Sequence, residues 1–370
     1  MEKMKVLSIG YDKDLFDPKS RASKRIVRYG ELFGELQIIV FTRRSEGFEE
    51  IKLSPCVSVF PTNAVSKVGM VSNAFFLGKK IGKGASVITC QDPFESAFVG
   101  LMLKSPLKAK LHIQEHGDFF SSNFWRNESS LNKVRIILGR IALKQADRIR
   151  VVAERIKSTL VGFGLNENKI DVSSVYTESS FFVDKKEREG SNFVFLSVGR
   201  LVSQKNFHLL IDSFNNLPED IKNNSELQII GGGILYKSLK NKIEKLELGD
   251  KVKLLGHQSD VKSFYSTSDV FVMSSNYEGW GRVVLEATMA HLPVIMTDVG
   301  CAGELIKNGK SGIVAPIGNT GKLTEAMEFA YRNKDKMKEY ADTAMIQVSK
   351  LKTEEESVIA FVESVKNTAK

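Results

Sequence analysis

The sequence predicts an α/β protein of two domains, each built on a parallel sheet covered by helices. At 370 residues the chain is long enough for two domains of ordinary size. In its second half, short apolar runs alternate with segments that carry an apolar residue every three or four positions. Strands that alternate with helices in this way indicate parallel pairing in a doubly wound sheet.

The alternation is clearest in the second half. Phe207, Leu210, Ile211 and Phe214 have the spacing of one helix face. Further helices are expected at 236–246, 261–266 and 282–290, and strands at 194–198, 227–230, 253–255, 270–273, 293–296 and 313–314. Ligands of such sheets bind beyond the carboxyl ends of the strands, so the loops that follow the strands are the candidate site.

The first half alternates less regularly. Strands are expected there at 6–9, 36–41, 57–60, 87–89, 110–114 and 149–152. A charged stretch around 180–192 reads as a linker, which places the domains at 1–185 and 190–350. The last segment, 353–366, has apolar residues at helical spacing.

A glycine-rich turn separates two carboxylates eight residues apart, Glu278 and Glu286. Gly279, Trp280 and Gly281 lie between a predicted strand and a predicted helix. Free N–H groups at a helix N-terminus attract anions, and glycine lets a ligand approach the backbone. The carboxylates would repel a phosphate but can accept hydrogen bonds from hydroxyl groups. A phosphate beside a polyol indicates a nucleotide sugar.

Two cations follow the first strand of the second half, Arg200 directly after Gly199 and then Lys205. A departing nucleoside diphosphate gains negative charge as the sugar bond breaks. Two cations and a helix N-terminus can stabilise that charge without a metal ion. The alternative is that both are ordinary surface cations.

These motifs resemble those of the retaining GT-B glycosyltransferases of the GT4 family (glycosyl transferases group 1). The resemblance covers nearly the whole second half, through 197–201, 204–206, 230–233, 255–257, 278–286, 298–300 and 312–314. It implies the GT-B fold, two Rossmann-like domains facing across a cleft, with the terminal helix packed back on the first domain. It also implies transfer of a hexose from a nucleotide diphosphate sugar with retention of the anomeric configuration.

The resemblance implies a role for each donor-side residue. Arg200 and Lys205 would bind the diphosphate, Glu286 the ribose hydroxyls and Glu278 the transferred sugar, while the segment Gly256-His257 would hold the base. Each has a plainer alternative. Glu286 could form a salt bridge within its helix, Glu278 could be an ordinary acid of a turn, and Gly256-His257 could be an ordinary turn after a strand.

In the first half, His116 of a His-Gly-Asp segment resembles the histidine with which family members contact the donor sugar, and it completes a predicted catalytic group with Arg200, Lys205 and Glu278. Asp118 could orient His116 or the acceptor, or cap the next segment. Asp92 resembles an acid of a cleft loop. Only Gly10 stands where many members have paired glycines, which leaves the position of the acceptor open.

The net charge of +9 lies entirely in the first half, because residues 1–189 hold 31 Lys/Arg and 22 Asp/Glu. A basic domain suggests a polyanionic partner, and a basic surface that aids solubility is the alternative. The segment 131–144 has apolar residues on one face and Lys133, Arg135, Arg140 and Lys144 around it. It could lie on an anionic membrane, near a lipid-linked acceptor, or pack into the core.

Several function classes are not supported. The three cysteines have no metal-binding spacing, and Asp12 and Asp14 lie too near the start to be the metal-binding pair of the GT-A glycosyltransferases. We therefore expect no metal and no cofactor, the nucleotide sugar being a co-substrate. The chain has no apolar run of about 20 residues and no signal-peptide pattern, so we expect a cytoplasmic protein, peripheral to the membrane at most.

Two other functions remain as alternatives to a glycosyltransferase. A nucleotide-sugar epimerase shares the fold, but its acid and base motifs differ. A basic nucleic-acid-binding protein is the alternative from another class, although no nucleic-acid-binding signature is present and no nucleic acid partner is expected.

Overall fold

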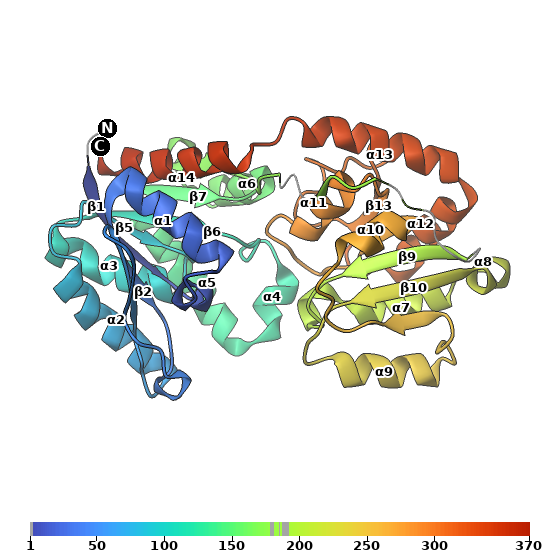
Figure 1. Cartoon of the computed structure of the whole chain (residues 1–370), viewed down its shortest axis with the longest axis horizontal. Helices are drawn as coiled ribbons and strands as arrows, with labels where there is room; N and C mark the ends of the chain where they lie inside the picture. Colours follow the sequence, from blue (N-terminus) through green and yellow to red (C-terminus); the bar gives the residue numbers. More distant parts are fainter. Residues whose placement is uncertain (1–2, 178–180, 185, 187–191) are drawn as a thin grey trace. The chain divides into compact units, whose positions relative to one another are not determined.

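The computed structural model describes residues 3–177, 181–184, 186 and 192–370. The chain forms two compact units (Figure 1). The first holds Met1–Ser174 and Glu354–Lys370, and the second holds Val175–Thr353. The division falls before the expected boundary at 185, and most of the expected linker at 180–192 lies outside the described residues.

The first unit contains an eight-stranded sheet in the order β3-β4-β2-β1-β5-β6-β7-β8. All neighbours pair in parallel except β3 with β4. The strands are β1 (Met4–Gly10), β2 (Gly34–Val40), β3 (Ile51–Ser54), β4 (Val57–Pro61), β5 (Val87–Cys90), β6 (Lys110–Glu115), β7 (Arg148–Val151) and β8 (Ile170–Val172). All six expected strands are present, and the two short edge strands β3 and β8 were not anticipated.

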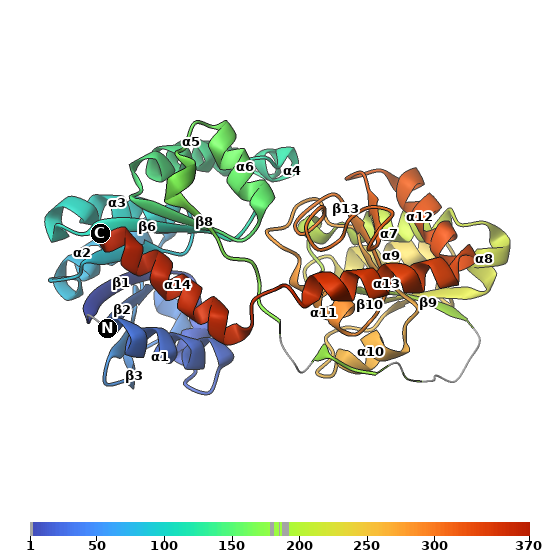
Figure 2. The same ribbon diagram turned by 90° about the horizontal axis from the view of Figure 1, so that it is seen from above.

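Helices cover both faces of this sheet. The helices of the unit are α1 (Arg21–Phe33), α2 (Lys67–Ile81), α3 (Glu95–Leu107), α4 (Asn123–Glu128), α5 (Ser130–Gln145), α6 (Glu154–Gly162) and α14 (Glu354–Ala369). Helix α14, the last element of the chain, lies over β5, β6 and β7 beside α1 (Figure 2).

A buried polar network attaches α14 to the sheet. The imidazole of His112 on β6 lies 2.9 Å from Thr89 Oγ1 through Nδ1 and 3.1 Å from Ser364 Oγ through Nε2. Ser364 Oγ in turn donates to Asp171 Oδ2 at 2.6 Å, and Arg148 pairs with the same carboxylate. Burial, followed by the positive charge of Arg150, lowers the pKa of His112 to about 3. The ring is therefore neutral at neutral pH, and the network holds the helix without a buried imidazolium.

The second unit contains a six-stranded, entirely parallel sheet in the order β11-β10-β9-β12-β13-β14. Its strands are β9 (Phe193–Val198), β10 (Ser225–Ile230), β11 (Val252–Leu254), β12 (Val270–Met273), β13 (Val294–Thr297) and β14 (Ile313–Ala315). Its helices are α7 (Phe207–Asn215), α8 (Glu219–Asn223), α9 (Tyr236–Lys245), α10 (Lys262–Thr267), α11 (Arg282–Met289), α12 (Thr320–Arg332) and α13 (Lys334–Val348). The expected alternation of strands and helices is confirmed.

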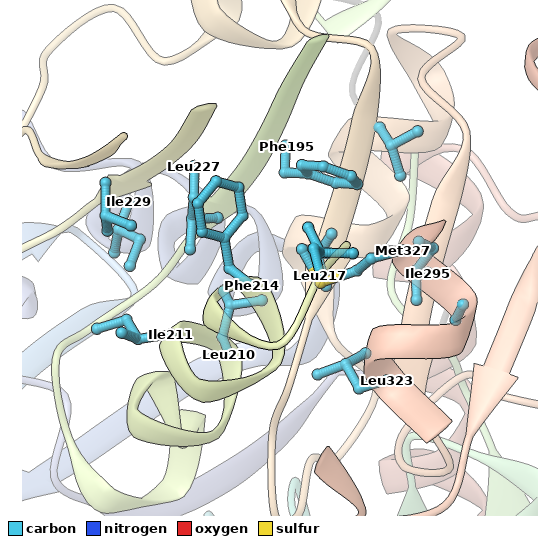
Figure 3. Close-up of a cluster of buried hydrophobic side chains, with 14 of the residues drawn as sticks. Phe195, Leu210, Ile211, Phe214, Leu217, Leu227, Ile229, Ile295, Leu323 and Met327 are labelled. Atoms are coloured by element: carbon cyan, nitrogen blue, oxygen red, sulfur yellow. The ribbon is translucent and has the colours of Figure 1, made fainter. Parts of the chain in front are cut away.

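The core of the second unit explains why α7 forms where the sequence predicts it. Asn206 caps the helix by accepting a hydrogen bond from the backbone N–H of Leu209. The apolar stripe of α7 then packs on the sheet beside Leu323 and Met327 of α12 (Figure 3). Removing this apolar surface from water fixes α7, and with it the loop that joins β9 to α7.

Candidate donor-binding site

The order of the strands in the second unit reverses between β9 and β12. From β9 the chain moves outward through β10 and β11, then returns to β12 and moves the other way through β13 and β14. The loops that follow β9 and β12 therefore flank this switch point at the carboxyl edge of the sheet, where such folds bind their ligands. Those loops carry the two cations and the first carboxylate that the sequence singles out.

The two loops are joined by hydrogen bonds along their length. Ser274 Oγ donates to the carbonyl oxygens of Lys205 and Asn206, at 2.9 and 3.1 Å. The Asn276 side chain donates to the carbonyl oxygen of Ser203 at 2.9 Å, and the Gln204 amide donates back to the second loop. Gln204 and Asn276 therefore fix the backbone of the site.

Lys205 and Glu278 form an ion pair at the centre of the site. The Lys205 Nζ lies 2.5 Å from Glu278 Oε1, and the two side chains are only 15% and 8% exposed. The hydroxyl of Ser275 donates to the same carboxylate oxygen at 2.7 Å. The sequence predicts Lys205 for the diphosphate and Glu278 for the sugar, and the structure brings both residues together. Sequence analysis missed Ser275, whose position two residues after a buried strand was the available signal.

Arg200 is free to receive a ligand. Its side chain is exposed, and it has no hydrogen bond or ion pair to any other residue among those that the structure describes. It follows β9 directly and lies five residues before Lys205. The loop after β9 thus presents one unpaired cation and one cation neutralised by a carboxylate.

Gly231 shows how closely the neighbouring loops approach each other. A Cβ atom on Gly231 would lie 1.9 Å from the carbonyl oxygen of Gly199, and its φ of +142° also disfavours other residues. The N–H of Gly231 donates to the carbonyl oxygen of Gly256 at 2.8 Å. His257, which follows Gly256 in the chain, is exposed. The loops after β9, β10 and β11 are therefore in direct contact, and Gly199, Gly256 and His257 lie on one edge.

The turn before α11 is equally close-packed. Gly281 caps α11 with a φ of +92°, which strains any other residue. The carbonyl oxygen of Trp280 accepts a hydrogen bond from the N–H of Cys301 at 2.7 Å. The indole Nε1 of Trp280 is buried and has no hydrogen-bond partner among the described residues. Unpaired buried donors of this kind are rare in proteins.

Glu286 lies one turn into α11, with its side chain 15% exposed. Tyr265 of α10 donates its hydroxyl to Glu286 Oε2 at 3.1 Å, and the Arg282 guanidinium lies 3.4 Å from Oε1. The salt bridge within α11 that the sequence leaves open is therefore present, between Arg282 and Glu286. The Tyr265 hydroxyl also orients the Glu286 carboxylate. Sequence analysis missed Tyr265, because no local pattern connects it to a residue 21 positions away.

The predicted residues of the first unit lie at the carboxyl ends of β1, β5 and β6. A Cβ atom on Gly10 would lie 1.8 Å from Gln91 Oε1, which accepts the N–H of Tyr11. Asp92 Oδ1 accepts the N–H of Phe94 at 2.7 Å, whereas Oδ2 has no partner among the described residues. Burial raises the pKa of this carboxyl group.

His116 directly follows β6, and its side chain is exposed to solvent. Desolvation by neighbouring protein atoms, followed by the positive charges of Arg150 and Arg25, lowers the pKa of His116. The ring is therefore neutral at neutral pH. Asp118 makes no hydrogen bond to His116, and its Oδ1 is unpartnered among the described residues. Of the three roles that the sequence leaves open for Asp118, a direct hydrogen bond to His116 is therefore not present, whereas the acceptor role stays a prediction. Burial and then Asp118 raise the pKa of Glu115, a buried acid that sequence analysis missed.

Other sites are not apparent in the described part of the chain. No three His, Cys, Asp or Glu side chains in it are grouped as metal ligands. A cavity of about 570 Å³ lies at the opposite, amino-terminal edge of the second sheet, lined by Phe193, Pro293 and Met337 among others. It contains none of the predicted donor residues. No described helix is long and apolar enough to cross a membrane.

The fold and the site define a class, the glycosyltransferases of GT-B fold. Among solved structures, the chain is similar to a sucrose-phosphate synthase from Thermosynechococcus elongatus, with a TM-score of 0.78 over 98% of both chains at 16% identity. It is also similar to the Anabaena HepE protein solved with UDP and glucose, with a TM-score of 0.74 at 18% identity, over 98% of this chain and 100% of that one. At these identities the likeness shows the fold.

Sequence comparison shows the family. Residues 179–346 match the profile of the family described as glycosyl transferases group 1. An uncharacterised glycosyltransferase of Methanocaldococcus jannaschii is 30% identical over 266 residues, which cover 70% of this chain and 69% of that protein. The capsular polysaccharide biosynthesis glycosyltransferase CapM of Staphylococcus aureus is 31% identical over 53% of this chain and 55% of its own length. The chain belongs to the group 1 glycosyltransferases and is a transferase enzyme.

Proposed function

We propose that this glycosyltransferase transfers a hexose from a nucleotide diphosphate sugar to an acceptor hydroxyl, with retention of the anomeric configuration. One observation carries the proposal. Two cations, a helix N-terminus and two carboxylates lie on the loops after β9 and β12 and on α11, the elements that flank the switch point of the second sheet, and Lys205 and Glu278 among them form an ion pair. This set of groups matches a donor that combines a diphosphate with sugar hydroxyls.

The diphosphate would be bound by Arg200, Lys205 and the N–H groups at the start of α11. Arg200 is exposed and unpaired among the described residues, so binding a phosphate breaks no existing interaction. Lys205 is already ordered by Glu278, and its ammonium has three donors, so it can contact a phosphate while keeping that carboxylate. Negative charge that develops on the leaving group would then meet preorganised donors.

The two carboxylates would bind different parts of the donor. Glu286 is held by the Tyr265 hydroxyl and accepts the ribose hydroxyls, while Glu278, held by Ser275 and Lys205, faces the transferred sugar. The backbone at Gly256 and His257 would hold the base. These assignments rest on the resemblance and on the general capacity of a carboxylate to accept several hydrogen bonds from hydroxyl groups.

Retention would follow an internal-return path. The bond between the anomeric carbon and the phosphate oxygen breaks, and the acceptor oxygen bonds to the same face of the carbon. The acceptor proton passes to the departing phosphate oxygen, so no enzymatic nucleophile is needed. Arg200 and Lys205 would stabilise the departing diphosphate, and His116 would contact the donor sugar as a neutral ring. We propose that no metal and no cofactor take part.

The acceptor would meet the first unit near Gly10, Asp92 and Asp118, at the carboxyl ends of β1, β5 and β6. The names of two relatives place them in capsular polysaccharide and lipopolysaccharide core biosynthesis. We propose a related acceptor here, a sugar or lipid-linked sugar of a cell-envelope polysaccharide or glycolipid. The described cysteines are free, which suits a reducing cytoplasm.

The test is a screen of nucleotide sugars for release of nucleoside diphosphate, run with excess EDTA and without it. We expect turnover of one donor in both conditions. Arg200→Ala and Lys205→Ala should each reduce it about 10²-fold, the scale of losing one preorganised charge donor. Lys336→Ala, an exposed lysine paired with Glu339 on α13, is the matched control. Turnover that depends on added magnesium or manganese would refute metal independence.

Family membership favours transfer over the two alternatives. An epimerase would convert its nucleotide sugar in the absence of acceptor and release a free sugar-nucleotide isomer. A nucleic-acid-binding protein would bind random RNA in a salt-dependent manner that nucleoside diphosphate does not change. Either result, without glycosyl transfer, would contradict the proposal.

A further inference from the structure

Helix α5 carries a continuous stripe of exposed apolar side chains. Leu131, Val134, Ile137, Leu138 and Ile141 are 46%, 50%, 62%, 42% and 49% exposed. Their spacing places them on one side of the helix, while Asn132, Ile136, Gly139 and Leu143 of the opposite side are buried. The alternative that this apolar face packs into the core is therefore wrong. Five large apolar residues in contact with water on one helix require an explanation.

Neighbouring residues only partly extend this stripe. Phe124 of α4, the helix that packs against α5, is 38% exposed. Phe120 and Trp125 are buried, and Trp125 stacks on Phe94 within the first unit. Figure 2 shows α4, α5 and α6 together at one edge of the first unit. The exposed apolar surface is thus centred on α5.

Two of the four basic residues of α5 already have partners within the first unit, so fewer of them can contact an external ligand than the sequence suggests. Arg135 pairs with Glu95 at 2.5 Å, and the Arg140 guanidinium lies 4.1 Å above the ring of Phe163. Lys133 and Lys144 are exposed. Both lysines project beside the apolar stripe, on the Ile137 side of the helix. The surface therefore combines a broad apolar stripe with two flanking cations.

The charge pattern of α5 decides between candidate occupants. Residues 130–145 include no aspartate or glutamate. A second copy packed on this stripe would bring the lysines of both helices together with no carboxylate from either α5 to compensate. An anionic lipid surface accepts the apolar side chains among its acyl chains and places its head groups beside the lysines. The excess of nine positive charges in residues 1–189 acts in the same direction.

We propose that α5 is a membrane-docking helix that lies in the plane of an anionic bilayer, with Leu131, Val134, Ile137, Leu138 and Ile141 inserted. Apolar insertion supplies most of the affinity, because only two lysines flank the stripe. Binding therefore weakens in high salt but is not abolished, unlike a purely electrostatic attachment. This inference concerns a surface of the first unit and stands independently of the donor chemistry proposed for the second.

The test is cosedimentation of the full chain with vesicles of phosphatidylcholine, with and without phosphatidylglycerol. The double variant Ile137→Ser/Ile141→Ser removes two of the exposed side chains, and such exposed positions contribute little to folding stability. Ile346→Ser is the matched control, since Ile346 on α13 is 58% exposed and lies outside α5. Donor hydrolysis, measured without vesicles, reports that each variant is folded and keeps its donor site.

We expect the wild type and Ile346→Ser to bind the anionic vesicles, and the double variant to bind at least about tenfold more weakly. Donor hydrolysis should be unchanged in both variants. Three results would overturn the proposal: no binding by the wild type, equal binding to neutral vesicles, or equal loss in the Ile346 control. A concentration-dependent dimer that the double variant abolishes would assign the stripe to a second copy instead.

Discussion

Replacing Glu278 with glutamine separates its effect on diphosphate binding from its effect on transfer. Glutamine has the same shape, so the hydrogen bonds from Ser275 and Lys205 can persist while the negative charge is removed. In the wild type the Glu278 carboxylate neutralises Lys205 at 2.5 Å. It also repels a diphosphate that approaches Lys205. We therefore expect Glu278→Gln to tighten nucleoside diphosphate binding.

The size of this effect follows from the burial of the pair. Two unit charges about 4–7 Å apart interact by roughly 2–4 kcal/mol at an effective dielectric constant of 20. Both side chains are mostly buried, at 15% and 8% exposure, so solvent screens them only in part. If about half of this energy is realised, the Kd of the nucleoside diphosphate falls by about tenfold. Transfer should fall at least about 10²-fold, because Glu278 is expected to contact the transferred sugar.

Calorimetry with the nucleoside diphosphate and steady-state assays with the donor measure the two effects. Glu286→Gln is the matched control, the same chemical change eight residues further along. It should weaken diphosphate binding, because the ribose is shared by donor and product. If Glu278→Gln binds the diphosphate ten times more weakly, or keeps wild-type kcat, the assigned roles are wrong.

Three further predictions follow from the geometry. Arg200→Ala should weaken nucleoside diphosphate binding by about tenfold or more without lowering Tm, since the side chain has no partner in the described structure; a lower Tm with unchanged binding would contradict this. Gly231→Ala should destabilise the second unit by at least about 2 kcal/mol, whereas Gly232→Ala, which meets no atom within 4 Å, should not; urea unfolding compares them. Burial lowers the pKa of His112 to about 3, so only the unfolded state gains this proton between pH 6.5 and 3. Stability should therefore fall by several kcal/mol across that window, and His112→Asn should flatten the decline in pH-dependent melting.

Much of the fold could be predicted from apolar periodicity. The central strands β9, β12 and β13 of the second unit are buried on both faces, so they form short apolar runs in the sequence, and the apolar stripe of α7 has helical spacing. The edge strands β3 and β8 were missed, because a charged residue, Lys52 or Asp171, interrupts each of them. Neither strand therefore contains a continuous apolar run.

The candidate site could be predicted only in part. The sequence identifies Lys205 and Glu278 separately, but nothing local indicates that they pair across 73 residues. Gln204 and Asn206 belong to the recognised motif, yet their side chains connect the loops rather than point to a ligand role. For α5, periodicity predicts the apolar stripe but cannot determine whether another element covers it. The ion pair between Lys205 and Glu278, the hydrogen bonds between the loops and the exposure of the α5 stripe all depend on tertiary contacts, which local sequence patterns do not show.

The central claim is that the second unit binds the donor diphosphate at the carboxyl edge of its sheet. The most direct measurement is a crystal structure of the chain with the nucleoside diphosphate that the donor screen identifies. We predict phosphate oxygens about 2.7–3.2 Å from the side chains of Arg200 and Lys205. We also predict ribose hydroxyls within hydrogen-bond distance of Glu286. A diphosphate bound at the opposite edge, near Phe193 and Pro293, or one that contacts neither cation, would contradict the account.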